Sequence, residues 1–429
     1  MRSWPTDPPS PLWTALSRER FRGEALRGDL EADVVVVGGG LSGLAAAIEL
    51  ARRGHRTVLL EAATIGAGAS GRANGQVIAA LTRHGPNAIR ALWPGERGER
   101  FLAMVAGAAD VLFELVDRYG IDCDARRNGW LQPAHSPGRL RRVAGLAEQW
   151  AALGAPTGVL SAGEMSRRLG TFVYVGGWEH RGGGHINPFA FTQGLARAAG
   201  QEGVSVFEKS PALSLKRDRD CWLVATPAGS VRAPRVALAT AAYTGDLWPE
   251  IRRTIVPVTS YQAATDPLGS LAERILPGDE AASDTRMDLR YLRKDREGRL
   301  VSGGALALQV SASHRLPRLV GQRLHEMFPD LPPDPMRSFW GGRIAMTVDR
   351  LPRLFRRSDG LSAWIGCNGR GLALGCAMGP VMADAVEGVA DDRLALRPTD
   401  PHAVPIHPVA IRTARFILPW YRFKDRREV

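Results

Sequence analysis

The sequence predicts an α/β protein with two domains, one a parallel sheet between helices and the other an α+β domain on an antiparallel sheet. Three observations carry this prediction. The chain has 429 residues, more than one hydrophobic core usually organises. A strand–loop–helix–strand unit spans Asp33–Glu61. Short β-rich segments separated by turn residues then occupy residues 204–240 and 255–310, which favours antiparallel sheet.

The first unit consists of two apolar segments and a helix between them. Asp33–Val37 contains four consecutive valines and Thr57–Glu61 is also apolar, which favours strands that are covered on both faces. Residues 44–53 are rich in alanine and leucine and are followed by Gly54, which predicts a helix that ends there.

Three glycines connect the first strand to this helix with the spacing Gly38-x-Gly40-x-x-Gly43. Between a strand and a helix this spacing indicates a dinucleotide site. The first glycine permits the turn, the second lets a pyrophosphate approach the backbone, and the third lets helix and strand pack closely. The helix N-terminus favours the anion. Glu61, at the end of the next strand, is expected to accept hydrogen bonds from the ribose of the AMP half, and its charge disfavours NADP.

Further helices and strands are expected along the rest of the chain. Helical spacing and capping residues predict helices over residues 101–119, 138–153, 161–169, 188–199 and 371–389. β-rich segments predict strands at residues 204–207, 212–215, 222–226, 236–240, 291–293, 300–304 and 364–366. Residues 1–30 form an N-terminal arm, which Trp4, Leu12, Trp13 and Leu16 would anchor, and residues 396–429 form a C-terminal tail.

The composition restricts the kinds of partner. The formal net charge is +12, but the arginines are scattered and no recognition motif accompanies them, so that no nucleic-acid partner is expected. The four cysteines form no C-x-x-C pair, which predicts no metal site and no disulfide framework and fits a reducing cytoplasm. The N-terminus lacks the apolar core of a signal peptide, and no segment reads as an integral membrane span.

Five segments resemble, in the same order, those of the FAD-dependent amine and amino-acid oxidoreductases. This family includes D-amino-acid oxidase, glycine oxidase, sarcosine oxidase and γ-glutamylputrescine oxidase, which the segments resemble most. Gly68-Ala-Ser-Gly-Arg-Ala-Asn-Gly-Gln76 resembles the family's G-A-S-G-R-N-G-G-Q, and Gly366-Cys-Asn-Gly-Arg-Gly-Leu-Ala-Leu374 resembles its G-Y-N-G-R-G-V-A-L. Residues 340–352 resemble its W-x-G-x-x-A-x-T-x-D-x-x-P segment. Residues 236–244 and 257–265 resemble its strand over the cofactor and the start of its substrate-domain sheet.

The resemblance implies FAD, held non-covalently, and a Rossmann-like FAD-binding domain interleaved with the α+β substrate domain. Residues 27–85, 180–245 and 340–395 would form the first domain, and residues 86–179 and 246–339 the second. The residues expected at the cofactor are Gly38, Gly40, Leu41, Ser42, Gly43, Glu61, Ala62, Gly68, Ala69, Ser70, Arg72, Asn74, Gly75, Gln76, Ala212, Ala239, Thr240, Asn368, Gly369, Arg370, Gly371 and Leu372. Backbone N–H groups at 368–372 and the guanidiniums of Arg72 and Arg370 would stabilise negative charge on reduced flavin.

The activity that the resemblance implies is oxidation of a primary or secondary amine to an imine by hydride transfer to flavin N5, with reoxidation by O₂. The amine would be γ-glutamylputrescine or a related amine or amino acid. A first alternative is an amine or D-amino-acid dehydrogenase that passes electrons to a quinone or a protein acceptor. A second alternative is a flavoprotein that acts on modified RNA, or a non-catalytic subunit. Because the flavin accepts the hydride, no metal is required.

The chain departs from the family pattern at several positions near the expected flavin: Ala73 and Asn74 replace the usual Asn-Gly, and Ala373 and Cys367 also differ. Ala373 stands where sarcosine-oxidase-like enzymes have a lysine for the substrate carboxylate, which favours an amine without that carboxylate. Cys367 stands where tyrosine is common, and covalent flavin attachment and a small buried thiol are the two interpretations. The candidate catalytic or substrate-contacting residues are His185, Arg343, Trp340 and Tyr261. Packing or helix capping is the alternative role for these side chains.

Overall fold

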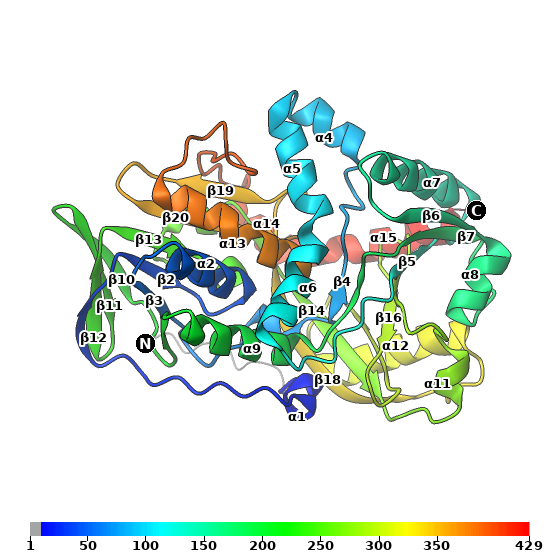
Figure 1. Cartoon of the computed structure of the whole chain (residues 1–429). Helices are drawn as coiled ribbons and strands as arrows, with labels where there is room; N and C mark the ends of the chain where they lie inside the picture. Colours follow the sequence, from blue (N-terminus) through cyan, green and yellow to red (C-terminus); the bar gives the residue numbers. More distant parts are fainter. Residues whose placement is uncertain (1–9, 429) are drawn as a thin grey trace.

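The strand–helix–strand unit near the N-terminus forms as predicted. In the computed structural model, which describes residues 10–428, β2 (Val34–Val37) and β3 (Thr57–Leu60) are parallel, fully buried strands. Helix α2 (Leu41–Arg52) connects them (Figure 1). Alternate valines of β2 pack into two different cores, one on each face of the sheet, which is why every position of this strand is apolar.

A six-stranded sheet grows around this unit from distant parts of the chain. Its strand order is β19-β20-β13-β2-β3-β9, and all neighbours are parallel except β19 and β20. The added strands are β9 (Ser205–Phe207), β13 (Arg235–Leu238), β19 (Arg353–Arg356) and β20 (Leu361–Ile365). Helices α2, α9 (Pro188–Gln201) and α13 (Gly371–Glu387) cover one face of it and pack on one another (Figure 1).

A four-stranded sheet with the order β1-β12-β11-β10 covers the opposite face. It consists of β10 (Ser214–Asp218), β11 (Cys221–Thr226), β12 (Gly229–Ala233) and β1 (Gly28–Glu31). The arm is therefore more ordered than expected, because β1 pairs in parallel with β12. The arm also contains α1 (Leu12–Leu16), in which Trp13 is buried with its ring edge-to-face against Trp340. Trp4 lies outside the described residues.

The second large sheet is mainly antiparallel and has eight strands in the order β18-β14-β17-β16-β15-β5-β7-β6. Only β15 and β5 pair in parallel. The strands are β5 (Trp130–Pro133), β6 (Thr157–Ser161), β7 (Gly176–His180), β14 (Val256–Thr265), β15 (Ala281–Ser283), β16 (Tyr291–Lys294), β17 (Leu300–Gly304) and β18 (Met336–Met346). The predicted α/β class, with a parallel and an antiparallel sheet, is thus confirmed, whereas the domain boundaries stay a prediction.

Helices surround the second sheet and join the two halves. They are α4 (Pro86–Leu92), α5 (Glu96–Ala106), α6 (Ala108–Tyr119), α7 (Pro137–Ala151), α8 (Ala162–Leu169), α10 (Pro249–Arg252), α11 (Leu271–Arg274) and α12 (Ala312–Met327). The single helix expected over residues 101–119 is wrong: Gly107 separates α5 from α6. Short elements complete the connections, namely α3 (Ala69–Arg72), β4 (Gln76–Val77), β8 (Gly184–His185) and the 3₁₀ helix η1 (Ala241–Tyr243).

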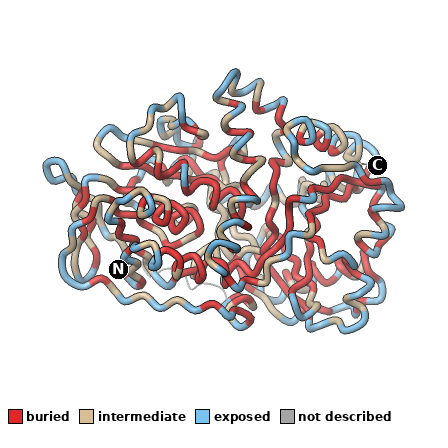
Figure 2. The backbone as a smooth tube through the Cα atoms, viewed as in Figure 1, coloured by how far each residue is buried: buried red, intermediate tan, exposed pale blue. Residues whose placement is uncertain are grey.

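The C-terminal tail folds into helices on the outside of the second sheet. These are α14 (His407–Thr413), the 3₁₀ helix η2 (Ala414–Phe416) and α15 (Ile417–Arg427), and none of their described residues is buried. Buried backbone instead runs through the two large sheets and α13 (Figure 2). Among the described residues, no helix combines the length and the apolar character that crossing a lipid bilayer requires.

Candidate cofactor and substrate site

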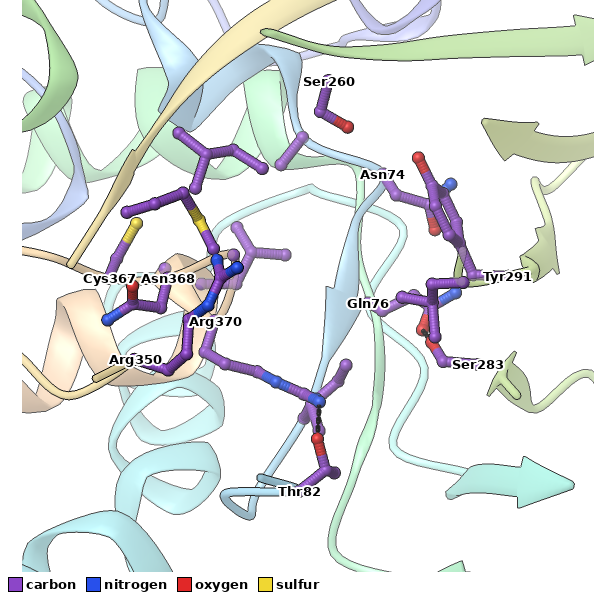
Figure 3. Close-up of a pocket in the computed structure, with 18 of the residues that line it drawn as sticks. Asn74, Gln76, Thr82, Ser260, Ser283, Tyr291, Arg350, Cys367, Asn368 and Arg370 are labelled. Atoms are coloured by element: carbon purple, nitrogen blue, oxygen red, sulfur yellow. Dashed lines mark hydrogen bonds between the residues drawn. The ribbon is translucent and has the colours of Figure 1, made fainter. Parts of the chain in front are cut away.

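A cavity of about 470 Å³ lies where the two large sheets meet. The start of α2 and residues 367–372 line one side of it. Asn74 and Gln76, together with side chains from β14, β16 and the 283–289 loop, line the other (Figure 3). The segments that carry the resemblance to the FAD-dependent family therefore converge on one cavity, although some lie 300 residues apart in sequence.

The glycines before α2 have the geometry that the motif requires. Gly38 has φ +113°, which L-residues with a side chain rarely adopt. A Cβ on Gly43 would lie 2.0 Å from the carbonyl oxygen of Gly38, so that only glycine lets α2 pack this close to β2. Gly40 lines the cavity itself, and a Cβ there would lie 2.8 Å from Ser70 Oγ.

Glu61 is fixed at the end of β3 by backbone donors. The N–H of Gly39 donates to Oε2 at 2.8 Å, and that of Ala63 donates to Oε1 at 2.9 Å. Burial raises the pKa of the Glu61 carboxyl above its usual value, although these N–H bonds oppose the shift. The carboxylate thus stands beside the glycine turn with lone pairs left for further donors.

Residues 69–76 cross from the α2 turn to the second sheet. Ser70 Oγ accepts from the N–H of Leu41 at 3.1 Å, and Arg72 donates from Nη1 to the carbonyl of Gly341 on β18 at 3.2 Å. Asn74 Nδ2 donates to Gln262 Oε1 at 3.2 Å. This segment therefore couples the nucleotide-binding turn to the strands that face the other end of the cavity.

Residues 366–372 form a tight loop in front of α13. Asn368 has φ +51° and its amide is held on both sides, since Oδ1 accepts from the N–H of Thr347 at 2.9 Å and Nδ2 donates to the carbonyl of Gly366 at 2.7 Å. The loop presents the free N–H groups of the α13 N-terminus to the cavity. Burial raises the pKa of Cys367 beside it, which keeps this thiol protonated.

Arg370 projects from this loop across the cavity. One end of its guanidinium donates to Thr82 Oγ1, while Nη1 is buried without a hydrogen-bond partner within the described structure (Figure 3). Burial, and then the neighbouring Arg83, lower the pKa of Arg370 to about 10. An anion next to this cation would satisfy the remaining donor.

The wall opposite the 366–372 loop is polar. Gln76 Oε1 accepts from Ser283 Oγ at 2.6 Å (Figure 3) and from the Trp130 indole at 3.2 Å. Gln262 Nε2 donates to the Tyr291 hydroxyl at 2.9 Å. Apart from Gln76 on β4, these residues come from β5, β14, β15 and β16, so the large antiparallel sheet supplies most of this wall.

The cavity is strongly cationic. Both lining aspartates are neutralised, because Asp284 pairs with Arg286 and Asp288 with Arg323 and Arg422. Five lining arginines, by contrast, have no carboxylate partner in the described part of the chain: Arg83, Arg142, Arg343, Arg350 and Arg370. Sequence analysis singled out only Arg343 and Arg370, because the other three lie in segments without motif or periodicity.

The structure brings most of the expected cofactor residues to this cavity. Those that line it are Gly40, Leu41, Ser42, Ala69, Ser70, Arg72, Asn74, Gly75, Gln76, Ala239, Asn368, Gly369, Arg370, Gly371 and Leu372. The remaining ones do not line it, namely Gly38, Gly43, Glu61, Ala62, Gly68, Ala212 and Thr240. Gly38, Gly43 and Glu61 shape the turn from behind.

Of the four catalytic or substrate candidates, only Arg343 reaches the cavity. His185 lies in a separate pocket, where its Nε2 is 2.8 Å from the carbonyl oxygen of Asp279. Trp340 is buried and donates to the carbonyl of Arg72 at 2.9 Å, and Tyr261 stacks on Phe339 with ring centres 5.3 Å apart. Trp340 and Tyr261 therefore have packing contacts, the role given above as the alternative to contact with the substrate.

Comparison with known proteins identifies the family of this chain. A model of the DAO family, described as FAD dependent oxidoreductase, matches residues 33–385. The chain is 29% identical to Probable oxidoreductase OrdL of Rhizobium meliloti, over 98% of this chain and 99% of that protein. It is 29% identical to gamma-glutamylputrescine oxidoreductase of Escherichia coli, over 90% and 91%. The crystal structure of glycine oxidase from Geobacillus kaustophilus has the same fold, with a TM-score of 0.69 at 24% identity, covering 83% of this chain and 95% of that one.

The family model covers most of the chain, including the glycine turn, residues 69–76 and the 366–372 loop. The residues that line the cavity also suit a dinucleotide with a negatively charged centre, because they combine two helix N-termini, a backbone turn that admits no side chain and a guanidinium whose buried Nη1 has no hydrogen-bond partner among the described residues. The chain therefore belongs to the FAD dependent oxidoreductase family and is an FAD-dependent oxidoreductase.

Proposed function

We propose that this enzyme oxidises a primary or secondary amine to an imine, and that the amine carries an anionic group away from its reacting carbon, unlike the α-carboxylate that Ala373 disfavours. FAD, when bound, would supply the two-electron oxidation of the amine. The observation that carries the proposal is the cationic lining: five arginines that line the cavity, including Arg370 of the 366–372 loop, have no carboxylate partner in the described structure.

This lining acts on both parts of such a substrate. A positive environment lowers the pKa of a bound amine and therefore favours the neutral amine, the form from which a hydride can leave. The same guanidiniums offer bidentate donors to a carboxylate. Arg83, Arg142 and Arg350 pair with no carboxylate among the described residues, so an anionic substrate group would meet them without breaking an ion pair seen there. The relative named gamma-glutamylputrescine oxidoreductase supports this class of substrate.

The cofactor assignment of single residues is part of the same proposal. The α2 N-terminus at Gly40–Ser42 would hold the pyrophosphate, and Glu61 would accept from the AMP ribose. The α13 N-terminus and Arg370 would face the negative charge of the reduced flavin, since both direct unsatisfied N–H donors into the cavity. The half-buried Cys367, whose raised pKa keeps its thiol protonated, supports non-covalent binding, because flavin attachment needs a reactive thiolate.

Anaerobic mixing with a panel of amines tests the proposed reaction. Amines with and without a carboxylate, matched in length, are added to the purified flavoprotein while the visible flavin absorbance is followed. We expect amines to bleach the flavin absorbance and matched alcohols to leave it unchanged. At low substrate concentration, amines with a carboxylate should bleach it faster than amines without one. Bleaching by 2-hydroxy acids but by no amine would contradict it.

The electron acceptor is proposed to be O₂, with a quinone or a protein as the alternative. Release of hydrogen peroxide in step with amine oxidation in air supports the oxidase. Turnover that requires an added quinone and releases no peroxide supports the dehydrogenase. We also propose a cytoplasmic location, which the four free cysteines favour.

A further inference from the structure

The C-terminal segment carries a concentration of exposed apolar side chains. Helices α14 and α15 and the turn between them have no buried residue among those described. Large hydrophobic side chains nevertheless lie exposed along this segment at Ile406, Val409, Ile411, Phe416, Ile417, Trp420 and Phe423. Contiguous exposure of this kind marks an interaction surface more often than chance.

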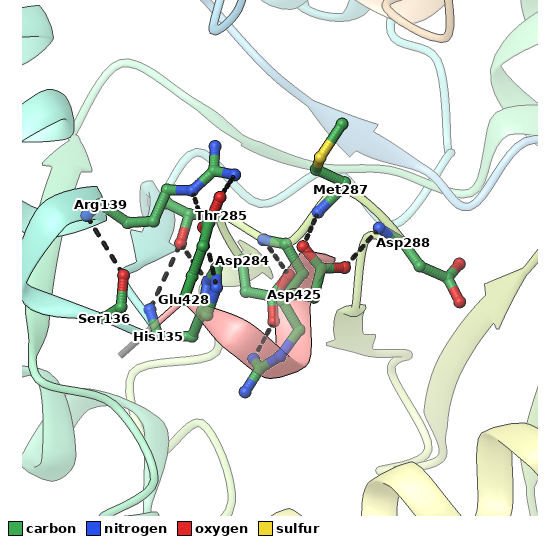
Figure 4. Close-up of polar contacts among 10 residues, drawn as sticks. His135, Ser136, Arg139, Asp284, Thr285, Met287, Asp288, Asp425 and Glu428 are labelled. Carbon is green, nitrogen blue, oxygen red and sulfur yellow. Dashed lines mark hydrogen bonds and ion pairs between the residues drawn. The ribbon is translucent and has the colours of Figure 1, made fainter. Parts of the chain in front are cut away.

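The inner face of α15 is fixed to the protein body through its acidic residues. The carboxylate of Asp425 accepts from the N–H groups of Met287 at 2.7 Å and Asp288 at 2.9 Å. Glu428, just beyond the helix, accepts from Arg139 at 2.6 Å (Figure 4). Both acidic side chains of this region therefore point inward and are already paired.

The outer face of α15 presents aromatic rings and cations together. The rings of Trp420 and Phe423 stack with centres 5.8 Å apart. Lys424 Nζ lies 5.2 Å from the Trp420 ring centre, and the Arg427 guanidinium lies 4.2 Å from that of Phe423. Lys424, Arg426 and Arg427 have no ion-pair partner in the described residues. The sequence contains no acidic residue from position 401 to 424.

We propose that this aromatic–basic face, defined by Ile417, Trp420, Phe423, Lys424, Arg426 and Arg427, docks on the surface of an anionic phospholipid bilayer. Trp and Phe side chains partition into the headgroup boundary, and lysine and arginine beside them attract anionic lipids. Since Asp425 and Glu428 face inward, no acidic side chain among the described residues of the outer face opposes that attraction. A second copy of this face is a poorer partner, because it would bring cations of the same sign together.

Docking through this face would place the cavity close to the bilayer. Leu418, on the same helix, lines the cavity, and an α-helix is about 10 Å across with its side chains. An electron acceptor dissolved in the bilayer would therefore reach the enzyme beside its cavity. The lipid proposal itself does not depend on which substrate or acceptor the enzyme uses.

Vesicle flotation of the full-length flavoprotein tests the proposal. The probes are vesicles of phosphatidylcholine alone and of phosphatidylcholine with phosphatidylglycerol, at low and at high salt. We expect binding to the anionic vesicles only, and its loss at high salt. Lys424→Glu together with Arg427→Glu should lower the partition coefficient roughly 30-fold or more, because each cation near an anionic surface contributes about fivefold. Trp420→Ser together with Phe423→Ser should also weaken binding.

Two control variants make the same kinds of change elsewhere, one residue in each. Phe172→Ser removes an aromatic side chain that is 91% exposed, and Arg27→Glu reverses an exposed cation without an ion-pair partner in the described structure. Both should bind like the wild type, and all variants should keep their FAD and their amine turnover. The proposal is overturned if the wild type does not float with anionic vesicles or if the controls lose binding equally. A dimer in sedimentation that Trp420→Ser with Phe423→Ser converts to a monomer, without vesicle binding, would assign the face to a second copy.

Discussion

Arg293 on β16 ties three parts of the chain together beneath the cavity, and its replacement tests how the two halves are joined. Its guanidinium donates to the carbonyls of Asn74 at 2.7 Å, Ile186 at 2.8 Å and Lys294 at 2.8 Å. It also lies 4.4 Å from the ring centre of Trp13. Arg293→Met keeps much of the side-chain volume but removes every donor.

The expected loss is a difference between two larger effects. Each of the three carbonyls left without its donor costs about 1–3 kcal/mol, and the contact with Trp13 contributes about 1 kcal/mol. Burial lowers the pKa of Arg293 to about 10, which corresponds to about 3 kcal/mol against the charged form that the methionine relieves. The net destabilisation is about 4 kcal/mol, or about 4 °C in Tm for a chain of this length.

Thermal unfolding and FAD content measure this prediction together. Arg293→Met should lower Tm by about 4 °C and also release FAD more readily, because Asn74 belongs to the cavity wall. The control is Arg274→Met, whose ion pair with Asp330 is exposed and contributes less than about 1 kcal/mol. If Arg293→Met unfolds within a degree of Arg274→Met and keeps its FAD, the proposed coupling between the halves is refuted.

Three further changes have distinct expected outcomes. Gly40→Val places a Cβ in the cavity 2.8 Å from Ser70 Oγ, and it should abolish FAD retention while circular dichroism shows an intact fold. The control Gly245→Val adds its side chain in open space and should retain FAD. Equal FAD content in the two variants would remove the pyrophosphate assignment. Cys367→Ser should bind FAD like the wild type. If flavin stays with the wild-type protein after acid precipitation but is released from this variant, Cys367 instead forms a covalent bond to the flavin. Burial lowers the pKa of His180 to about 4, so the unfolded chain takes up this proton at a higher pH than the folded chain does. The free energy of unfolding therefore falls by up to about 3 kcal/mol as the pH drops from 6.5 to 4. His180→Phe should flatten the dependence of Tm on pH in that window, and an unchanged slope would contradict the assignment.

The elements that sequence predicts well are those whose physical requirement is local. The valines of β2, the glycine turn and α2 follow from burial on both faces and from one close approach, all within 20 residues. The capping residue Ser161 likewise fixes the start of α8 through its bond to the N–H of Glu164. Such features need no knowledge of distant partners.

The features that sequence missed depend on distant partners. β1 has little apolar pattern and becomes a strand only because β12, about 200 residues away, offers it an edge. Arg83 and Arg350 line the cavity from loops, where no periodicity indicates direction. His185 follows a conspicuous glycine run, yet the pairing of β8 with β4 puts its ring into the separate pocket beside Asp279.

The FAD content of the purified protein tests the central claim most directly. The protein is precipitated with acid, and the flavin in the supernatant is identified and compared with the amount of chain. We expect one FAD per chain, and we expect all of this FAD in the supernatant after precipitation. A colourless protein that takes up no added FAD would contradict the assignment of the cavity and of the reaction that depends on it.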